Sequence, residues 1–412
     1  MQLVAYGAQD VYLTGNPQIT FFKVVYRRHT NFSMECIEQT WSGSDIADGK
    51  CVATIARNGD LVHKMHLQID VGNTQKVEAI SDLIVDVTVE IGGQKIDKQS
   101  GAFMQAWNEL THANNNVSVE LGTLFTKMSG PASFSNQSRF IPLNFWFCKN
   151  AGLALPLIAL QYHEVKVILN HTLTTAYTAG NVSRNTLWVD YIYLDTDERR
   201  RFAQVSHEYL IEQVQEQILQ TGAGDHNLRF NHPVKELIWF AKGTDGKSFT
   251  TPVVEHGDLA AATYTLKLNG HERFSPRPHT YFSRVQVYQH HSGAGGDNGS
   301  TRIAETALEQ GAYTINGIWL QNQMGWFSDS ICVYSFALNP EEHQPSGTCN
   351  FSRIDTAVLN TSAAVVDNIQ DGLKVAGNVT VDNDLPQVPR IVAINYNVLR
   401  IMSGMGGLAY SN

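Results

Sequence analysis

The chain of 412 residues has no long apolar run. The longest, at 153–160, is about eight residues long and contains Pro156, whereas a helix that crosses a bilayer needs about 20 apolar residues. The N-terminal segment has no basic stretch and reaches an acid at Asp10, which is unlike a secretory signal peptide. These features predict a soluble protein.

Cysteine is scarce, and no two cysteines form a C-x-x-C pair. An odd number at wide spacing fits neither a disulfide framework nor a zinc module. We therefore expect reduced thiols, as in a cytosolic setting. The five residues are Cys36, Cys51, Cys148, Cys332 and Cys349.

Positive charge is also limited, because 30 Lys and Arg face 39 Asp and Glu and leave a net charge of -9. Affinity for nucleic acid comes largely from cationic side chains, so we expect no direct nucleic-acid binding. Apolar residues make up 43% of the chain, enough for a large core. Since one core rarely serves more than roughly 250–300 residues, two domains are expected.

Alternation of apolar and polar residues is the dominant pattern. It is clear at 61–70 and at 83–91, where the second stretch ends in Gly92-Gly93, a hairpin signal. Helical spacing is visible only at 102–112. Many short strands without regularly alternating helices indicate an all-β chain of antiparallel sandwiches. Further strands are expected at 139–148, 160–169, 187–194, 234–240, 264–269, 281–288, 331–338, 350–359 and 391–399.

Two pairs of segments resemble each other within the chain. The strand and tight turn at 89–95 resemble 267–273, and 144–147 resemble 334–337. Both offsets are close to about 180–190 residues, which favours a tandem duplication, with chance similarity between hairpins as the alternative. The densest charge run, at 195–207, is the expected connector.

Fifteen histidines raise the question of a metal site. His63 and His66 are the closest pair within one expected strand, but residues three apart on a strand point to opposite faces and cannot share an ion. His290-His291 lies beside a Gly-rich segment with no acidic cluster nearby in the sequence. We therefore expect neither a metal site nor a cofactor.

Each candidate enzyme motif in the sequence is incomplete or lies in the wrong context. The segment 241–248 matches a relaxed phosphate-loop pattern, but such a loop must open a helix, and it is followed by a β-branched stretch broken by Pro252. His207-Glu208 lacks the second histidine of a zinc protease, and no G-x-S-x-G elbow occurs. We expect no catalytic residues.

Nine N-x-S/T sequons occur, as chance alone produces in a chain rich in Asn, Ser and Thr. Glycosylation also requires a transferase that a cytosolic chain does not meet. The candidates for glycan attachment are Asn298, Asn378 and Asn181.

Five segments resemble the major capsid proteins of nucleocytoplasmic large DNA viruses. The first includes Leu3-Val-Ala-Tyr-Gly-Ala-Gln-Asp10 and the last ends in Gly404-Met-Gly-Gly-Leu-Ala-Tyr-Ser-Asn412. They follow one another in the family's order from end to end of the chain. Their positions are 3–28, 152–166, 188–212, 344–355 and 395–412.

The resemblance implies two tandem eight-stranded antiparallel jelly-roll barrels, a double jelly roll, with short helices in inserted loops. It implies an N-terminal arm at 1–26 on the inner side of a capsid, a first jelly roll at 27–200, a connector at 201–207 and a second jelly roll at 208–412. The loops 111–138 and 290–330 match no family pattern.

The same resemblance implies a structural role. Three copies would form a nearly hexagonal capsomer that tiles an icosahedral shell, in contact with neighbouring capsomers and with minor capsid and penton proteins, and close to an inner viral membrane. The protein would be made in the host cytoplasm and reside in the virion. A jelly-roll carbohydrate-binding protein and a nucleotide-binding enzyme are the alternatives, and the five segments favour the capsid role over both.

Overall fold

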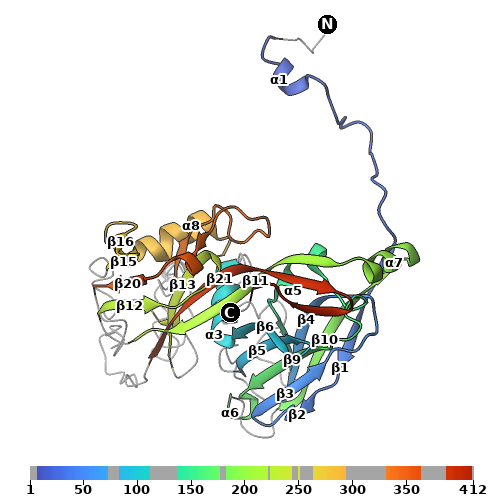
Figure 1. Ribbon diagram of the computed structural model, residues 1–412, viewed down its shortest axis with the longest axis horizontal. Coiled ribbons are helices and arrows are strands. Elements are labelled where there is room, and N and C mark those ends of the chain that lie inside the picture. The colour runs from blue at the N-terminus through green and yellow to red at the C-terminus, as the bar shows by residue number, and fades with distance from the viewer. Residues whose placement is uncertain are drawn as a thin grey trace, which may run out of the picture.

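The computed structural model describes residues 7–72, 83–111, 137–176, 182–220, 223–243, 249–250, 263–293, 331–362 and 387–410. Its strands pair antiparallel in four sheets, and Figure 1 shows them grouped as two sandwiches with few helices. The predicted all-β class is confirmed.

Two sheets form the first barrel. One has the order β1 (Phe32–Gln39), β10 (Val182–Leu194), β4 (Leu61–Val71) and β7 (Gln137–Pro142), with β8 (Leu155–Pro156) also on β4. The other has the order β2 (Ser42–Gly43), β3 (Gly49–Thr54), β9 (Val165–His171), β5 (Ile84–Ile91) and β6 (Gln94–Ser100). Their inward side chains form one buried core.

Two further sheets form the second barrel. One has the order β11 (His207–Ile218), β21 (Gln387–Met402) and β13 (Pro233–Gly243), with β14 (Phe249–Thr250), β18 (Ile331–Ser335) and β19 (Cys349–Asn350) on β13 and β22 (Met405–Leu408) on β21. The other has the order β12 (Gly224–Leu228), β20 (Ala357–Thr361), β15 (Thr263–Leu268) and β16 (His271–Glu272), with β17 (Arg277–Pro278) on β15.

The strand order of the first barrel recurs in the second. The order β1-β10-β4-β7 corresponds to β11-β21-β13-β18, and β3-β9-β5-β6 corresponds to β12-β20-β15-β16. This arrangement of two packed antiparallel sheets is a jelly roll. The chain is therefore a double jelly roll, as expected.

The first internal resemblance corresponds to a repeated hairpin. Gly92 and Gly93 have φ of 58° and 80°, and Asn269 and Gly270 have φ of 51° and 77°. Positive φ at both central residues is typical of the two-residue turn whose twist matches that of the flanking strands. The same turn thus joins β5 to β6 and β15 to β16.

The expected helix at 102–112 is present as α3 (Gly101–Thr111). Within the connector, α7 (Thr196–Gln204) begins where the Asp195 side chain accepts a hydrogen bond from the Thr196 N–H, an ordinary N-cap. The remaining described helices are α1 (Val11–Thr14), α5 (Trp146–Lys149), η1 (Ala151–Leu153), α6 (Leu173–Ala176), η2 (Tyr281–Val285), α8 (Gln286–His290) and η4 (Phe351–Arg353).

The prediction of a strand at 281–288 is wrong, since η2 and α8 occupy it. Its buried residues, Phe282, Ser283, Gln286 and Val287, recur with helical spacing. The segment follows β16 and the short β17, whereas α3 directly follows β6 in the first barrel. Packing on the sheet thus overrides the strand preference of its aromatic and β-branched residues.

Three other expectations need correction. The strand at 139–148 ends at Pro142 and gives way to α5, so the likeness of 144–147 to 334–337 pairs a helix with a strand. The strand at 350–359 is divided by η4. Strands β1, β3, β11 and β12 were not predicted. In β11 the reason is physical, because polar residues on this strand are buried.

Candidate functional site: the junction between the two barrels

Helix α3 of the first barrel packs on the outer face of the β11-β21-β13-β18 sheet of the second. Its apolar side chains share one buried cluster with side chains of β13, β18 and β21. Full burial of an aliphatic or aromatic side chain contributes about 1.5–3 kcal/mol, so this contact holds the two barrels as one body. The cluster comprises Ala102, Phe103, Ala106, Trp107 and Leu110 with Ile238, Phe240, Val287, Ile331, Val333, Val392 and Ile394.

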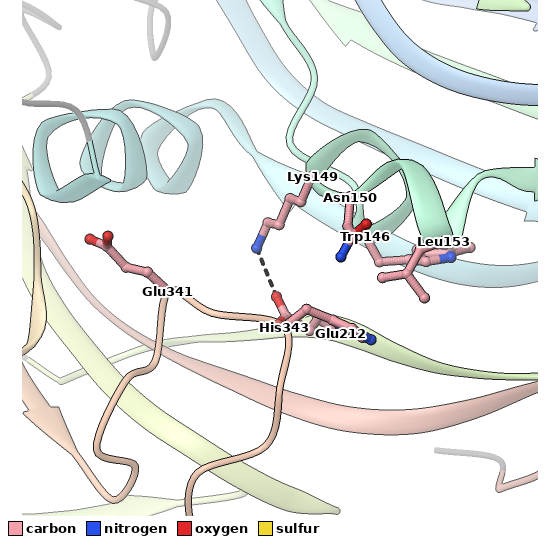
Figure 2. A pocket seen from close by; sticks show the side chains of 7 residues that line it. All are labelled: Trp146, Lys149, Asn150, Leu153, Glu212, Glu341 and His343. Carbon is pink, nitrogen blue, oxygen red and sulfur yellow. Dashed lines mark hydrogen bonds and ion pairs between the residues drawn. The ribbon is translucent and has the colours of Figure 1, made fainter. Parts of the chain in front are cut away.

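An ionic group lies beside this apolar contact. The Glu212 carboxylate on β11 accepts hydrogen bonds from Lys149 Nζ of the first barrel at 2.8 Å and from Lys235 Nζ on β13 at 2.7 Å; Figure 2 shows the Lys149–Glu212 pair. Lys235 is fully buried and also donates to the Pro340 carbonyl. One carboxylate is therefore paired with a cation from each barrel.

The pKa values of this group follow from burial and from the number of opposite charges. Burial alone would raise the pKa of Glu212, but Lys149 and Lys235 outweigh it and lower the pKa to about 2. Burial lowers the pKa of Lys235, and Glu212 opposes this only in part because Lys149 is a second cation nearby. The ionised Glu212 carboxylate is thus the charge that stabilises both lysines of this group.

A second buried group is centred on His291, which follows α8. Its Nε2 lies 3.0 Å from a Glu236 carboxylate oxygen and its Nδ1 lies 3.1 Å from one of Glu341. Burial would lower the pKa of His291, but Glu236 and Glu341 outweigh it and raise the pKa to about 9. Both ring nitrogens therefore carry protons at neutral pH. No acidic cluster is near His290-His291 in the sequence, but the fold brings Glu236 and Glu341 to His291.

This histidine group also touches the first barrel. The Ser292 hydroxyl donates to the Thr111 carbonyl at 2.7 Å, and the Gly293 N–H donates to the Leu110 carbonyl at 2.7 Å. The ring of His291 lies edge-on to Trp107 of α3. The carbonyl groups at the end of α3 are thereby satisfied by residues of the second barrel.

The edge of β11 meets β6 of the first barrel. The Val214 N–H donates to the Asp97 carboxylate at 3.0 Å, and the Gln213 side chain donates to the Ile96 carbonyl. Burial raises the pKa of Asp97. The junction thus covers an edge that would otherwise expose unpaired backbone groups.

The C-terminal hairpin β21–β22 closes the junction on its other side. The Tyr162 N–H donates to the Gly404 carbonyl at 3.0 Å, and His163 Nδ1 lies 3.0 Å from the Gly406 carbonyl oxygen. Leu399 and Ile401 of β21 belong to the buried core of the first barrel. The second barrel thus completes the packing of the first.

A small cavity of about 90 Å³ lies in this junction, and Figure 2 shows its lining. Its volume suits a few water molecules, and the charged groups of Lys149 and Glu212 are already bonded to each other. The cavity is therefore better suited to bound water molecules than to a substrate. Its lining residues are Trp146, Lys149, Asn150, Leu153, Glu212, Glu341 and His343.

The N-terminal segment 7–31 lies apart from both barrels in Figure 1, and its side chains are exposed except at Asp10. Phe22 is 97% exposed and Tyr12 is 91% exposed. Exposed apolar surface of this extent marks a site that another surface covers. The exposed apolar residues are Val11, Tyr12, Leu13, Ile19, Phe21, Phe22, Val24, Val25 and Tyr26.

Several candidates from the sequence lie outside the described residues, namely Asn181, Asn298, Asn378 and most of 111–138 and 290–330. After the phosphate-loop match, Phe249–Thr250 forms β14 and pairs back onto β13, as expected for a hairpin rather than a nucleotide site.

The register of β4 shifts between Val62 and Met65, which interrupts the alternation from which opposite faces were predicted for His63 and His66. His63 is buried and bonds the Phe147 carbonyl, whereas His66 lies half-buried on the outer face beside Phe140. Within the described ranges no three His, Cys, Asp or Glu side chains are placed to hold a metal ion. In the same part of the chain, no helix has the length and apolarity to cross a membrane.

Two family models match the chain. The one described as major capsid protein N-terminus covers residues 20–195, and the one described as large eukaryotic DNA virus major capsid protein covers 198–300 and 326–407. The chain belongs to this family of major capsid proteins. The resemblance noted in the sequence is therefore confirmed, and the family is one of structural proteins rather than enzymes.

Similarity to individual capsid proteins extends over the whole chain. The major capsid protein of Pyramimonas orientalis virus is 49% identical, and that of Paramecium bursaria Chlorella virus 1 is 38% identical; each comparison covers 100% of this chain and 99% of the relative. The solved structure of PBCV-1 VP54 has a TM-score of 0.73 and 34% identity, and covers 95% of this chain and 100% of that one.

Proposed function

We propose that three copies of this capsid protein form one capsomer with a nearly hexagonal outline, and that such capsomers tile the icosahedral shell of a large DNA virus. The observation that carries the proposal is the repeated strand order within one rigidly joined chain. A threefold arrangement of two like barrels yields six barrels around one axis. A related structure is titled as a quasi-atomic model of the PBCV-1 virus capsid, with 33% identity and a TM-score of 0.72.

We also propose a division of the chain into an arm, two jelly rolls and a connector. We assign residues 1–26 to an arm, 27–200 to the first jelly roll, 201–207 to the connector and 208–412 to the second jelly roll. Support comes from the strands, since the two sheets of the first barrel use residues between 32 and 194 and those of the second use residues between 207 and 408.

The arm is proposed to contact neighbouring proteins on the inner side of the shell. No acidic residue occurs between Asp10 and Glu35, whereas Lys23 lies in the arm and Arg27 and Arg28 follow it directly. A cationic apolar segment suits an anionic partner. Neighbouring capsomers, minor capsid and penton proteins, and a nearby inner viral membrane are the partners proposed.

The virion is the proposed location, with synthesis and assembly in the host cytoplasm. The five cysteines of the protein form no disulfide bonds, which suits synthesis in a reducing compartment. If the chain carries glycans, we propose Asn298, Asn378 and Asn181 as their attachment sites.

The mass of the purified protein in solution, followed by electron microscopy, tests the proposal. Trimers that form hexagonal arrays support it. A monomer that binds sugars and never assembles would instead favour the carbohydrate-binding alternative.

A further inference from the structure

The junction inside the chain has two complementary sides. One side is α3, the helix that follows the sixth strand of the first barrel, whose described side chains from Gly101 to Leu110 are all buried. The other side is the outer face of the β11-β21-β13-β18 sheet, together with the edge of β11. Because the two barrels share one strand order, each side has a counterpart elsewhere in the molecule.

The counterpart of α3 is the helical segment η2–α8, which follows β16 and the short β17 as α3 follows β6. Its inner side is buried through Phe282 and Val287, but its outer side is not covered. Tyr288 is 88% exposed and Val285 is 41% exposed. An exposed aromatic residue on a rigid helix is typical of the centre of a protein interface.

The counterpart of the covered sheet face is the outer face of β1-β10-β4-β7. Trp188 lies opposite His66 and Glu38 in the strand register, and Gln68 lies opposite Phe140, so these side chains share that face. Trp188, His66 and Phe140 are only half-buried.

The edge of this face is also open. Among the described strands β1 pairs only with β10, and its register runs through all eight residues without a bulge. Phe32 and Met34 on β1 are 52% and 50% exposed. A long unprotected edge strand is a site that a neighbour covers in a soluble assembly. In the second barrel the equivalent strand, β11, is covered by β6.

We infer that a second copy of this chain covers this face, with the Tyr288 side of α8 from one copy packed on the Trp188 face of the next. The inference rests on the proposed trimer and names the surface that builds it. Such a contact is head to tail, and it closes into a ring of three when each copy is rotated by a third of a turn. The ring then alternates first and second barrels, with the junction inside the chain repeated between chains.

The sheet face buried within the chain is more apolar than the sheet face proposed to be buried between copies. The face covered by α3 presents Ile238, Val333 and Val392, whereas the equivalent face of the first barrel presents His66, Glu38 and Trp188. A face that is exposed before assembly must stay soluble, so it carries fewer aliphatic residues than a face buried during folding.

Crosslinking tests the geometry. In a Cys36→Ser background, Tyr288→Cys and Glu38→Cys in the same chain should be joined between copies by a short bismaleimide, giving covalent dimers and trimers on a denaturing gel. Ile218→Cys with Glu38→Cys is the matched control, because Ile218 is also an exposed apolar residue of the second barrel. The control should give no covalent trimer.

A charge substitution tests the energetics. Tyr288→Asp should raise the dissociation constant of the trimer at least about tenfold, as expected for a central aromatic contact, while Ile218→Asp leaves it unchanged. Melting temperatures should stay at the wild-type value, since both side chains are exposed. Intact trimers of Tyr288→Asp, together with no crosslinked product from the Tyr288→Cys and Glu38→Cys variant, would overturn this inference alone. A wild-type monomer at high concentration would overturn both this inference and the proposed trimer.

Discussion

Lys235 Nζ lies 2.7 Å from the Glu212 carboxylate, although β21 separates the two strands that carry these residues. Lys149 of the first barrel bonds the other oxygen of the same carboxylate. The centre of the double barrel is therefore held by one buried anion shared by two cations. Removal of one member of a buried ion pair costs far more than the intact pair contributes, because a charge remains buried without its partner.

Glu212→Gln should accordingly lower the free energy of unfolding by about 3–5 kcal/mol, because Lys149 and Lys235 would then face each other without an anion. Denaturant unfolding followed by tryptophan fluorescence measures the change. Glu208→Gln is the control on the same strand. Glu208 pairs with Arg400 at an exposed position, so its loss should cost less than about 1 kcal/mol. Equal effects of the two substitutions would refute the role given to Glu212.

The His291 group predicts a loss of stability at alkaline pH. The pKa of His291 is raised to about 9 by Glu236 and Glu341, so its contribution is complete below the unfolded pKa of about 6.5 and is lost as the pH rises through 9. The difference in melting temperature between wild type and His291→Gln should shrink between pH 6.5 and pH 10. His271→Gln, at an exposed position in β16, should show no such trend. A difference that is constant over this range would contradict the protonated state of His291.

The C-terminal hairpin packs closely against the first barrel at Gly406. A Cβ added there would lie 2.6 Å from Cδ2 of the fully buried Leu160, so Gly406→Ala should destabilise the protein by about 1–3 kcal/mol through overpacking. Hydrogen exchange at the Tyr162 N–H, which donates to Gly404, should become faster. Gly407→Ala is the control, because its Cβ would meet only the end of the Gln94 side chain. If both variants behave alike, the hairpin is not held by this contact.

Removal of residues 1–26 should separate folding from assembly. The described apolar residues of this segment are exposed, so the melting temperature should change by less than 1–2 °C, an order-of-magnitude figure corresponding to about 0.5 kcal/mol or less. Trimers should still form, while the higher arrays should be lost. Replacement of Phe21 and Phe22 by serine should reproduce this defect, and replacement of Thr14 and Asn16 should not. Normal arrays from the truncated protein would show that the arm has no role in assembly.

Local patterns in the sequence predicted much of the fold. Alternation marked β4 and β5, and Gly92-Gly93 marked the turn between β5 and β6, because a two-residue turn with positive φ at both positions has few possible sequences. Helix α3 was predicted from the spacing of Phe103, Ala106, Trp107 and Leu110.

The junction was much harder to predict because its partners are far apart in the chain. Glu236 and Glu341 lie 55 and 50 residues from His291, and only the fold brings them together. Strand β11 was missed because Glu212 and Gln213 are polar yet buried, so the alternation that reveals an exposed strand is absent. The segment 281–288 has strand-forming residues but packs as a helix.

The C-terminal hairpin also determines when the first barrel can finish folding during synthesis. Leu399 and Ile401 complete the core of the first barrel, although most of that barrel is translated before residue 200. Translation proceeds from the N-terminus, so the first barrel remains incomplete while nearly the whole second barrel is being made. A chain that ends before residue 399 therefore lacks part of the core of its first barrel.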